Sequence, residues 1–193
     1  MGVDGILGGA FDPPHDGHVA LAHAAIAHFR LDRLLVRVVE NPGHKGVEAS
    51  ADDRLALARI AFSEVTVAEV ALDPFARTVD SLEALGLDDP VFVVGADEFA
   101  SFLEWKEPAR VLGLARLGVA TRPGYPQSVL DAVLTRLTRP DRVEFFPLEP
   151  FPVSSSEIRE RVERRSPLDG LVPAGVAAEI ERRGLYRGRA GLH

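Results

Sequence analysis

Two histidines three positions apart follow the first apolar run of the chain. His15 and His18 stand in the stretch GGAFDPPHDGH, residues 8–18, after the apolar residues 3–7 and at the start of a segment with helical periodicity. Side chains three apart face the same way at a helix start. Glycines before a helix bring backbone N–H groups close to a ligand, and such groups attract phosphate. Two imidazoles there could stabilise charge on a transferring phosphoryl group, whereas the alternative is a plain turn with two surface histidines.

A second group of polar residues begins a predicted helix near the other end of the chain, in FPVSSSEIR, residues 151–159. Ser154 and Glu157 have the spacing of a capping box, so the serines need no ligand to explain them. The functional alternative is that the hydroxyl and N–H groups hold a triphosphate while Arg159 forks onto its oxygens. The residues alone leave both interpretations open.

Two other segments could contact a nucleotide. In VFVVGAD, residues 91–97, Gly95 permits close approach, and Asp97 either accepts hydrogen bonds from a ribose or an adenine amino group or caps a helix. Trp105 is the only tryptophan; it either anchors the core or stacks on a flat ring.

In NPGHK, residues 41–45, Lys45 offers a compact positive charge for phosphate and His44 a stacking or donor group. A solvated loop is the alternative.

These motifs together resemble a known family. GGAFDPPHDGH is similar to the signature of the nucleotidyltransferases with an (H/T)xGH motif, and most of all to GGTFDPxHxGH of bacterial nicotinate mononucleotide adenylyltransferases, with Ala10 in place of the usual Thr. SSSEIR resembles the family's triphosphate-binding SSxxIR, and GADEF with Trp105 resembles IIGxD…W. HK matches the end of PxxxPPHK on a shorter loop, and RPGY at residues 122–125 and TVDSL at residues 78–82 are similar to further family segments.

The resemblance implies adenylyl transfer in NAD biosynthesis, in which ATP and nicotinate mononucleotide give deamido-NAD and pyrophosphate. His15, His18 and Arg159 are the expected catalytic residues. The expected ATP-binding residues are Gly8, Gly9, Ala10, Phe11, His18, Gly95, Asp97, Arg122, Ser154, Ser155, Ser156 and Arg159. The expected mononucleotide-binding residues are His15, His44, Lys45, Thr78, Trp105 and Lys106. Mg²⁺ is expected to arrive on the substrate phosphates, without a dedicated protein metal site.

Several alternatives stay open. A related nucleotidyltransferase could use another acceptor, such as nicotinamide mononucleotide or phosphopantetheine, or transfer a cytidylyl group. A non-catalytic nucleotide sensor could use the same scaffold. A dinucleotide-binding oxidoreductase is disfavoured, because it would have GxGxxG after the first strand and this chain has GGAFDPPH.

The elements that position these residues alternate along the chain. We expect strands at residues 3–7, 34–39, 65–70, 91–94, 117–120 and 143–146. We expect helices at residues 18–30, 50–63, 77–85, 96–114 with a break near Pro108, 127–137, and from about 155 and 173. This alternation predicts an α/β fold, a doubly wound, Rossmann-like parallel sheet with helices on both faces. We assign residues 1–187 to a single nucleotidyltransferase domain and residues 188–193 to a loose tail.

Composition excludes several classes of protein. The chain has 193 residues, a net charge of -7 and no cysteine, so disulfides, cysteine-bound zinc and a thiol nucleophile are absent. The acidic balance argues against binding to nucleic acid or an anionic membrane. The first residues lack the pattern of a signal peptide, and no apolar stretch reaches about 18 residues. We therefore expect a cytoplasmic protein whose partners are ATP and a pyridine mononucleotide; the oligomeric state is left open, a homo-oligomer included.

Overall fold

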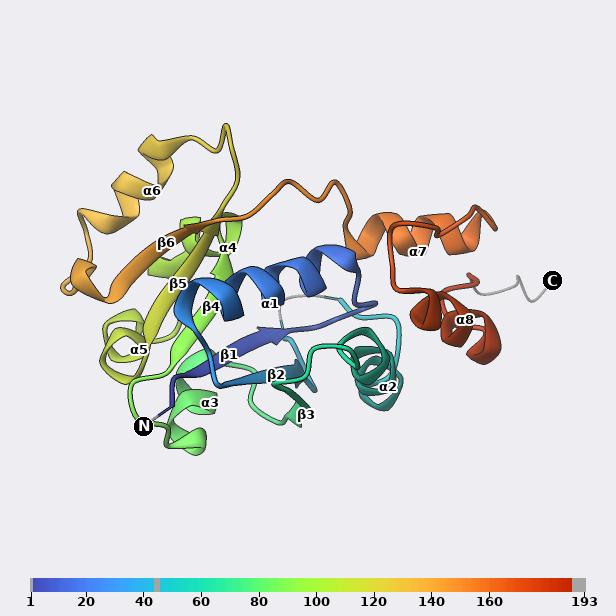
Figure 1. Ribbon diagram of the computed structural model, residues 1–193, viewed down its shortest axis with the longest axis horizontal. Coiled ribbons are helices and arrows are strands. Elements are labelled where there is room, and N and C mark those ends of the chain that lie inside the picture. Colours follow the sequence, from blue (N-terminus) through green and yellow to red (C-terminus); the bar gives the residue numbers. More distant parts are fainter. Residues whose placement is uncertain (1, 44–45, 189–193) are drawn as a thin grey trace.

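Short apolar runs form a single parallel sheet in residues 2–43 and 46–188, which the computed structural model describes (Figure 1). The strands of this six-stranded sheet lie in the order β3-β2-β1-β4-β5-β6, and every neighbouring pair is parallel. Their bounds are β1 (Asp4–Gly9), β2 (Arg33–Val39), β3 (Ala68–Asp73), β4 (Val91–Gly95), β5 (Arg116–Thr121) and β6 (Val143–Pro147). This order is that of a doubly wound sheet, so the predicted fold class is confirmed.

Helices connect the successive strands and follow the last one. They are α1 (Asp16–Phe29), α2 (Ala51–Ala61), α3 (Thr78–Leu85), α4 (Ala96–Ala100), α5 (Pro108–Leu114), α6 (Gln127–Leu134), α7 (Ser155–Glu163) and α8 (Ala174–Arg183), with short 3₁₀ turns η1 (Phe102–Glu104) and η2 (Pro140–Arg142). None of the helices in the described ranges is long and apolar enough to cross a membrane.

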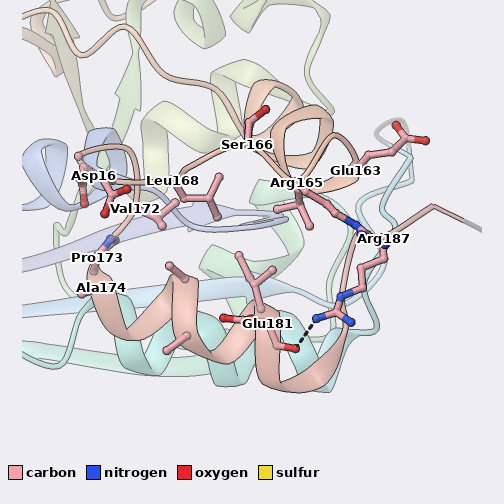
Figure 2. Close-up of a pocket in the computed structure, with 16 residues that line it drawn as sticks. Asp16, Glu163, Arg165, Ser166, Leu168, Val172, Pro173, Ala174, Glu181 and Arg187 are labelled. Carbon is pink, nitrogen blue, oxygen red and sulfur yellow. Dashed lines mark hydrogen bonds between the residues drawn. The ribbon is translucent and has the colours of Figure 1, made fainter.

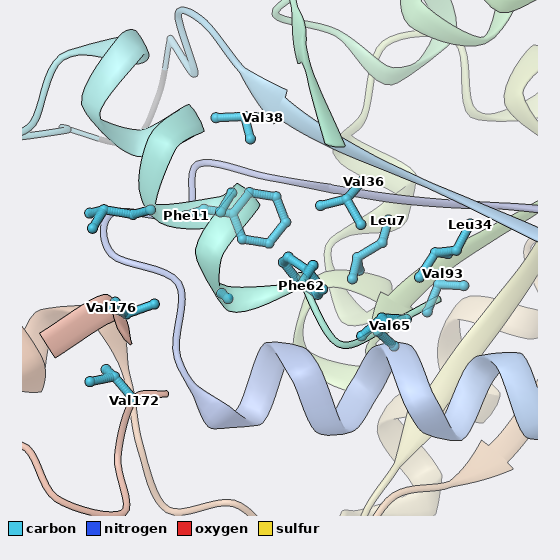
Figure 3. Close-up of a cluster of buried hydrophobic side chains, with 14 of the residues drawn as sticks. Leu7, Phe11, Leu34, Val36, Val38, Phe62, Val65, Val93, Val172 and Val176 are labelled. Carbon is cyan, nitrogen blue, oxygen red and sulfur yellow. The ribbon is translucent and has the colours of Figure 1, made fainter. Parts of the chain in front are cut away.

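Strand side chains alternate between two cores because neighbouring residues of a strand point to opposite faces. In β1, Leu7 belongs to the core under α1 and α2, and Ile6 to the core under α3, α5 and α6. Figure 3 shows the first of these cores, where Leu7 lies near Val36, Phe62 and Val65. Both faces of the sheet are therefore covered, as the continuous apolar runs predicted.

Most predicted elements agree with the structure to within a few residues, and the third strand differs most. The expected strand at residues 65–70 is wrong at its start, because Val65 lies in a turn after α2 and packs into the core with 4% of its surface exposed. The strand begins instead at Ala68, whose N–H donates to the carbonyl of Val65 (2.8 Å). The first helix begins at Asp16 rather than His18, and α6 ends at Leu134.

The order in which strands are added to the sheet changes direction between β1 and β4. From β1 the chain continues to β2 and β3 on one side, and then crosses to β4, β5 and β6 on the other. Ligands bind such sheets outside the carboxyl ends of the strands at this switch point. Gly9 and Gly95 are the last residues of these two strands. Helices α7 and α8 lie together at one end of the molecule, beyond the carboxyl end of β1 (Figure 1). Of the expected tail, residues 189–193 lie outside the described residues.

Candidate active site

The two histidines of the first motif lie against each other at the start of α1. His15 is the N-cap of the helix, and its backbone N–H donates to Nδ1 of His18 over 3.2 Å. The two rings stack with their centroids 3.7 Å apart. The expectation that His15 and His18 face the same way is confirmed, and both lie just beyond the carboxyl end of β1.

His15 is uncharged at neutral pH in this environment. Burial lowers the pKa of its imidazole to about 4, because the charged form loses its hydration. Its Nδ1 atom is buried and has no hydrogen-bond partner among the residues that the structure describes. His15 can therefore offer a neutral N–H or a lone pair to a ligand, but it brings no positive charge.

The Phe11 ring packs against His18 from the hydrophobic core. We expected Phe11 to contact ATP, but its ring is only 2% exposed and belongs to the core. Its centroid lies 5.0 Å from that of His18 and 5.8 Å from that of Phe62, in edge-to-face arrangements (Figure 3 shows Phe11 beside Phe62). The structure therefore does not support the expected contact of Phe11 with ATP.

The serine motif begins α7 directly against the histidine segment. Ser154 is the N-cap and accepts a hydrogen bond from the backbone N–H of Glu157 (3.2 Å), as the capping spacing predicted. The Ser155 hydroxyl donates to the carbonyl of Pro13 (2.8 Å). Arg159 Nη1 donates to the carbonyl of Asp12 (2.7 Å). Two motifs that are 142 and 147 residues apart at these contacts thus form one surface.

Arg159 keeps donors for a ligand. Its Nε donates to Glu48 Oε1 (2.8 Å), and its Nη2 lies at 3.4 Å from the Ser156 hydroxyl. A guanidinium has five N–H groups, so these contacts and the one to Asp12 leave some of them for phosphate oxygens. A cavity of about 450 Å³ adjoins this side chain and is also lined by Ser156 and Tyr186.

The third motif lies at the carboxyl end of β4, next to β1 in the sheet. Gly95 is the last residue of β4, and α4 follows at once with Asp97 exposed in its first turn. The N–H of Tyr125 donates to the carbonyl of Arg122 within the RPGY turn (3.1 Å), and the Tyr125 hydroxyl ties this turn to α4 by donating to the Ala96 carbonyl (3.3 Å). Gly95, Asp97 and the exposed Arg122 therefore lie at one edge of the sheet.

An ion pair joins the segments that carry three of the expected mononucleotide-binding residues, Thr78, Trp105 and Lys106. Lys106 Nζ donates to Asp80 Oδ1 (2.7 Å), which ties the residue after Trp105 to the first turn of α3, where Thr78 is the first residue. The Trp105 ring packs edge-to-face on Phe102, with centroids 5.2 Å apart, and is partly exposed. Stacking of Trp105 on a pyridine ring stays a prediction. His44 and Lys45 lie outside the described residues.

Arg54 holds the strand ends in place, and we did not predict it. Its guanidinium is 1% exposed and donates to four backbone carbonyls, at 2.8 Å to those of Ala10, Val39 and Glu40 and at 3.2 Å to that of Ala49. The expected ATP contact at Ala10 therefore involves a residue whose carbonyl is already used. The helix α2 did carry a signal, since Arg54 stands on the same stripe as its buried residues Leu57, Ala58 and Ala61.

Asp12, Tyr186 and Glu48 are further residues at the site to which sequence reasoning gave no role. Asp12 stood inside the first motif, and Glu48 carried no signal. Asp12 is 3% exposed and accepts hydrogen bonds from the Tyr186 hydroxyl (2.8 Å) and the backbone N–H of Glu48 (2.7 Å). Gly8 and Gly9 are the last two residues of β1. A Cβ atom added to Gly9 would lie 3.1 Å from the Phe11 ring, and one added to Gly8 would lie 3.5 Å from the Phe92 ring.

A cavity of about 1070 Å³ lies elsewhere, between α7 and α8 (Figure 2). Its floor is apolar, with Val162, Leu168 and Val172, and its rim carries charged side chains such as Arg187, which donates to the carbonyl of Glu181 (3.0 Å). None of the predicted site residues lines it. The predicted site residues in the described ranges therefore lie away from this cavity.

Comparison with known proteins agrees with this geometry. The family described as cytidylyltransferase-like matches residues 6–161. A protein of Bordetella avium named probable nicotinate-nucleotide adenylyltransferase is 37% identical over 191 residues, which cover 95% of this chain and 97% of that protein. A protein of Chlorobaculum parvum with the same name is 36% identical over 196 residues, covering 95% and 98% of the two chains.

A solved structure has the same fold. Nicotinic acid mononucleotide adenylyltransferase of Plasmodium falciparum, complexed with NaAD, superposes with a TM-score of 0.76 at 15% identity, covering 96% of this chain and 98% of that one. At this identity the match supports the fold, while the curated relatives show the family. The chain belongs to the nicotinate-nucleotide adenylyltransferases.

Proposed function

We propose that this chain transfers the adenylyl group of ATP to nicotinate mononucleotide, giving deamido-NAD and pyrophosphate. The names of the curated relatives support this reaction. The observation that carries it is the joint between the histidine segment and the start of α7, where Ser155 and Arg159 bond the carbonyls of Pro13 and Asp12 at 2.8 and 2.7 Å. A triphosphate that lies across this joint meets imidazoles on one side and a guanidinium with helix N–H groups on the other.

The reaction needs positioning more than proton transfer. A phosphate oxygen of the mononucleotide attacks the α-phosphorus of ATP, the bond from that phosphorus to the bridging oxygen breaks, and pyrophosphate leaves. The attacking phosphate is already ionised, so no general base is needed. His18 and neutral His15 would donate N–H groups to the α-phosphate, where charge builds up in the transition state. Arg159 would hold the pyrophosphate oxygens as they separate.

We propose that Mg²⁺ enters this site on the phosphates. Among the described residues there is no group of three or more His, Asp or Glu side chains with the arrangement of a metal site. Magnesium commonly keeps several waters and binds through substrate phosphates, so the phosphate-facing donors present fit that mode. When bound, the ion supplies charge neutralisation on the phosphate oxygens. Cytoplasmic location stays a prediction, and no oligomeric state is predicted.

The acceptor is tested by a pyrophosphate-release assay with ATP and Mg²⁺. Nicotinate mononucleotide, nicotinamide mononucleotide and phosphopantetheine are compared at equal concentrations. We expect the highest kcat/KM with nicotinate mononucleotide. A preference for one of the other acceptors would replace the proposed substrate. Binding of ATP without turnover of any acceptor would favour a nucleotide sensor on this scaffold.

The chemistry is tested by His18→Ala. Loss of one donor to a transition-state oxyanion costs about 100- to 1000-fold in kcat in well-studied enzymes, and we expect a loss of that order. His23→Ala is the matched control, because His23 is an exposed histidine on the same helix. Circular dichroism and melting temperature check that the fold is kept. Near-normal turnover by a folded His18→Ala enzyme would overturn the proposed role of this side chain.

A further inference from the structure

Asp12 is a buried residue whose carboxylate and carbonyl together join four parts of the chain. It accepts hydrogen bonds from the N–H groups of Glu48 (2.7 Å) and Ala49 (3.2 Å), and from the hydroxyl of Tyr186 (2.8 Å). Asp12 itself precedes the histidines, and its backbone carbonyl accepts Arg159. Asp12, 3% exposed, therefore lies at the contact between the histidine segment and α7 in the proposed active site.

Arg159 lies beside this charge without bonding to it. Arg159 Nη1 is 4.0 Å from Asp12 Oδ2, an ion pair beyond hydrogen-bond length, while the same nitrogen bonds the carbonyl of Asp12. A guanidinium and a carboxylate that are this close attract each other strongly where water is excluded. The carboxylate already has three other donors, and Arg159 Nη1 is bonded to the Asp12 carbonyl.

Tyr186 supplies the one side-chain donor among those three. The residue is 7% exposed and follows α8, and burial beside Asp12 raises the pKa of its hydroxyl, so it remains a proton donor across the physiological range. Without this hydroxyl, Asp12 Oδ1 would keep only the longer hydrogen bond from the backbone N–H of Ala49 (3.2 Å). A cation close enough to respond to this loss is Arg159, 4.0 Å from Asp12 Oδ2, which lines the cavity of about 450 Å³ together with Tyr186.

We propose that Tyr186 is a positioning residue for adenylyl transfer: by donating to Asp12, it keeps Arg159 from closing onto that carboxylate and so leaves the guanidinium available to the leaving pyrophosphate. The inference rests on the proposed function, because that function gives Arg159 its task. Tyr186 touches no reacting atom in this mechanism, and its effect passes entirely through Arg159. This last point makes the inference testable.

The test is a double-mutant cycle between Tyr186→Phe and Arg159→Lys. Tyr186→Phe removes a single oxygen atom and keeps the buried ring. In the wild-type background we expect it to lower kcat/KM for ATP about tenfold, which is about 1.4 kcal/mol of transition-state stabilisation. In the Arg159→Lys background we expect the same change to cost less than about twofold, because the forked guanidinium is already gone.

A purely structural role for Tyr186 predicts a different result. If the hydroxyl only stabilised the fold, Tyr186→Phe would lower the rate by the same factor in both backgrounds, and that additivity would overturn the proposal. Ile180→Val is the control, since Ile180 is a core residue of the neighbouring helix α8, 2% exposed. We expect its effects on activity to be small and equal in both backgrounds. All variants are assayed well below their melting temperatures.

A binding measurement separates this inference from the proposed function. Calorimetry with pyrophosphate and Mg²⁺ needs no acceptor, and we expect Tyr186→Phe to weaken pyrophosphate binding several-fold in the wild type and not in Arg159→Lys. If that coupling appears while nicotinate mononucleotide is not turned over, the reaction is wrong and the role of Tyr186 stands. If turnover is normal but coupling is absent from both assays, or if the wild type binds no pyrophosphate, the role of Tyr186 is wrong.

Discussion

Replacing Arg54 by methionine should remove a large part of the stability of this chain. The side chain is 1% exposed, and its donors satisfy four carbonyls. A buried acceptor left unpaired costs about 1–3 kcal/mol, so the loss of these four bonds, one buried and three partly buried, costs about 4 kcal/mol. Part of this is recovered because methionine buries no charge; the site does disfavour the cation, since burial lowers the pKa of Arg54. Allowing about 1 kcal/mol for that recovery, we expect a net loss of about 3 kcal/mol.

Urea denaturation followed by circular dichroism measures this loss. The matched control is Arg59→Met, because Arg59 is exposed on the same helix, and we expect it to change the free energy of unfolding by less than about 0.5 kcal/mol. Arg54→Lys keeps the charge with fewer donors and should fall between the two. A loss below about 1 kcal/mol for Arg54→Met, with an unchanged denaturant slope, would refute the view that the guanidinium satisfies otherwise unpaired carbonyls.

Two further predictions concern the ionisable groups of the joint. The pKa of His15 is about 4 in the folded chain, below the value of about 6.5 expected when unfolded, so the unfolded state binds the extra proton between these values. The free energy of unfolding should therefore fall as pH drops from about 6.5 to 4, and His15→Asn should flatten that slope in stepwise urea titrations; an unchanged slope would assign it to other groups. Glu48→Gln should lower the KM for ATP about two- to threefold in initial-rate assays, because the carboxylate, 58% exposed and 2.8 Å from Arg159, competes with phosphate for the guanidinium. A higher KM would mean that Glu48 instead holds Arg159 in place.

The fold was predictable because each strand is short, apolar and followed by a helical segment. Residues 91–94 form a continuous apolar run, which is typical of a strand buried on both faces, and β4 lies there. The third strand was misplaced because Val65 is as apolar as a strand residue but fills the core from a turn. Hydrophobicity reports burial, and it does not distinguish a buried turn from the strand that follows it.

The site was predictable only in part, for a related reason. Motifs can be matched one at a time, but nothing in the spacing of Ser155 and Pro13 says that their side chain and carbonyl meet. Their common family resemblance implied that they share a ligand. Arg54 and Asp12 act through backbone carbonyls and N–H groups, which every residue has, so their partners leave no mark on the sequence. The position of Arg54 on the buried stripe of α2 was a signal in the sequence that this arginine is buried.

The bond from Tyr186 to Asp12 also sets an order in time. The two residues are 174 positions apart, so at roughly 5–20 residues per second a ribosome makes the carboxylate about 9–35 s before its hydroxyl partner. The last strand ends at Pro147, so every strand of the sheet is synthesised before Tyr186 exists. A nascent or proteolytically shortened chain can therefore contain all six strands and both histidines while Asp12 still lacks the Tyr186 hydroxyl as its third donor. Completion of the joint between the histidine segment and α7 is thereby tied to synthesis of the segment that follows α8.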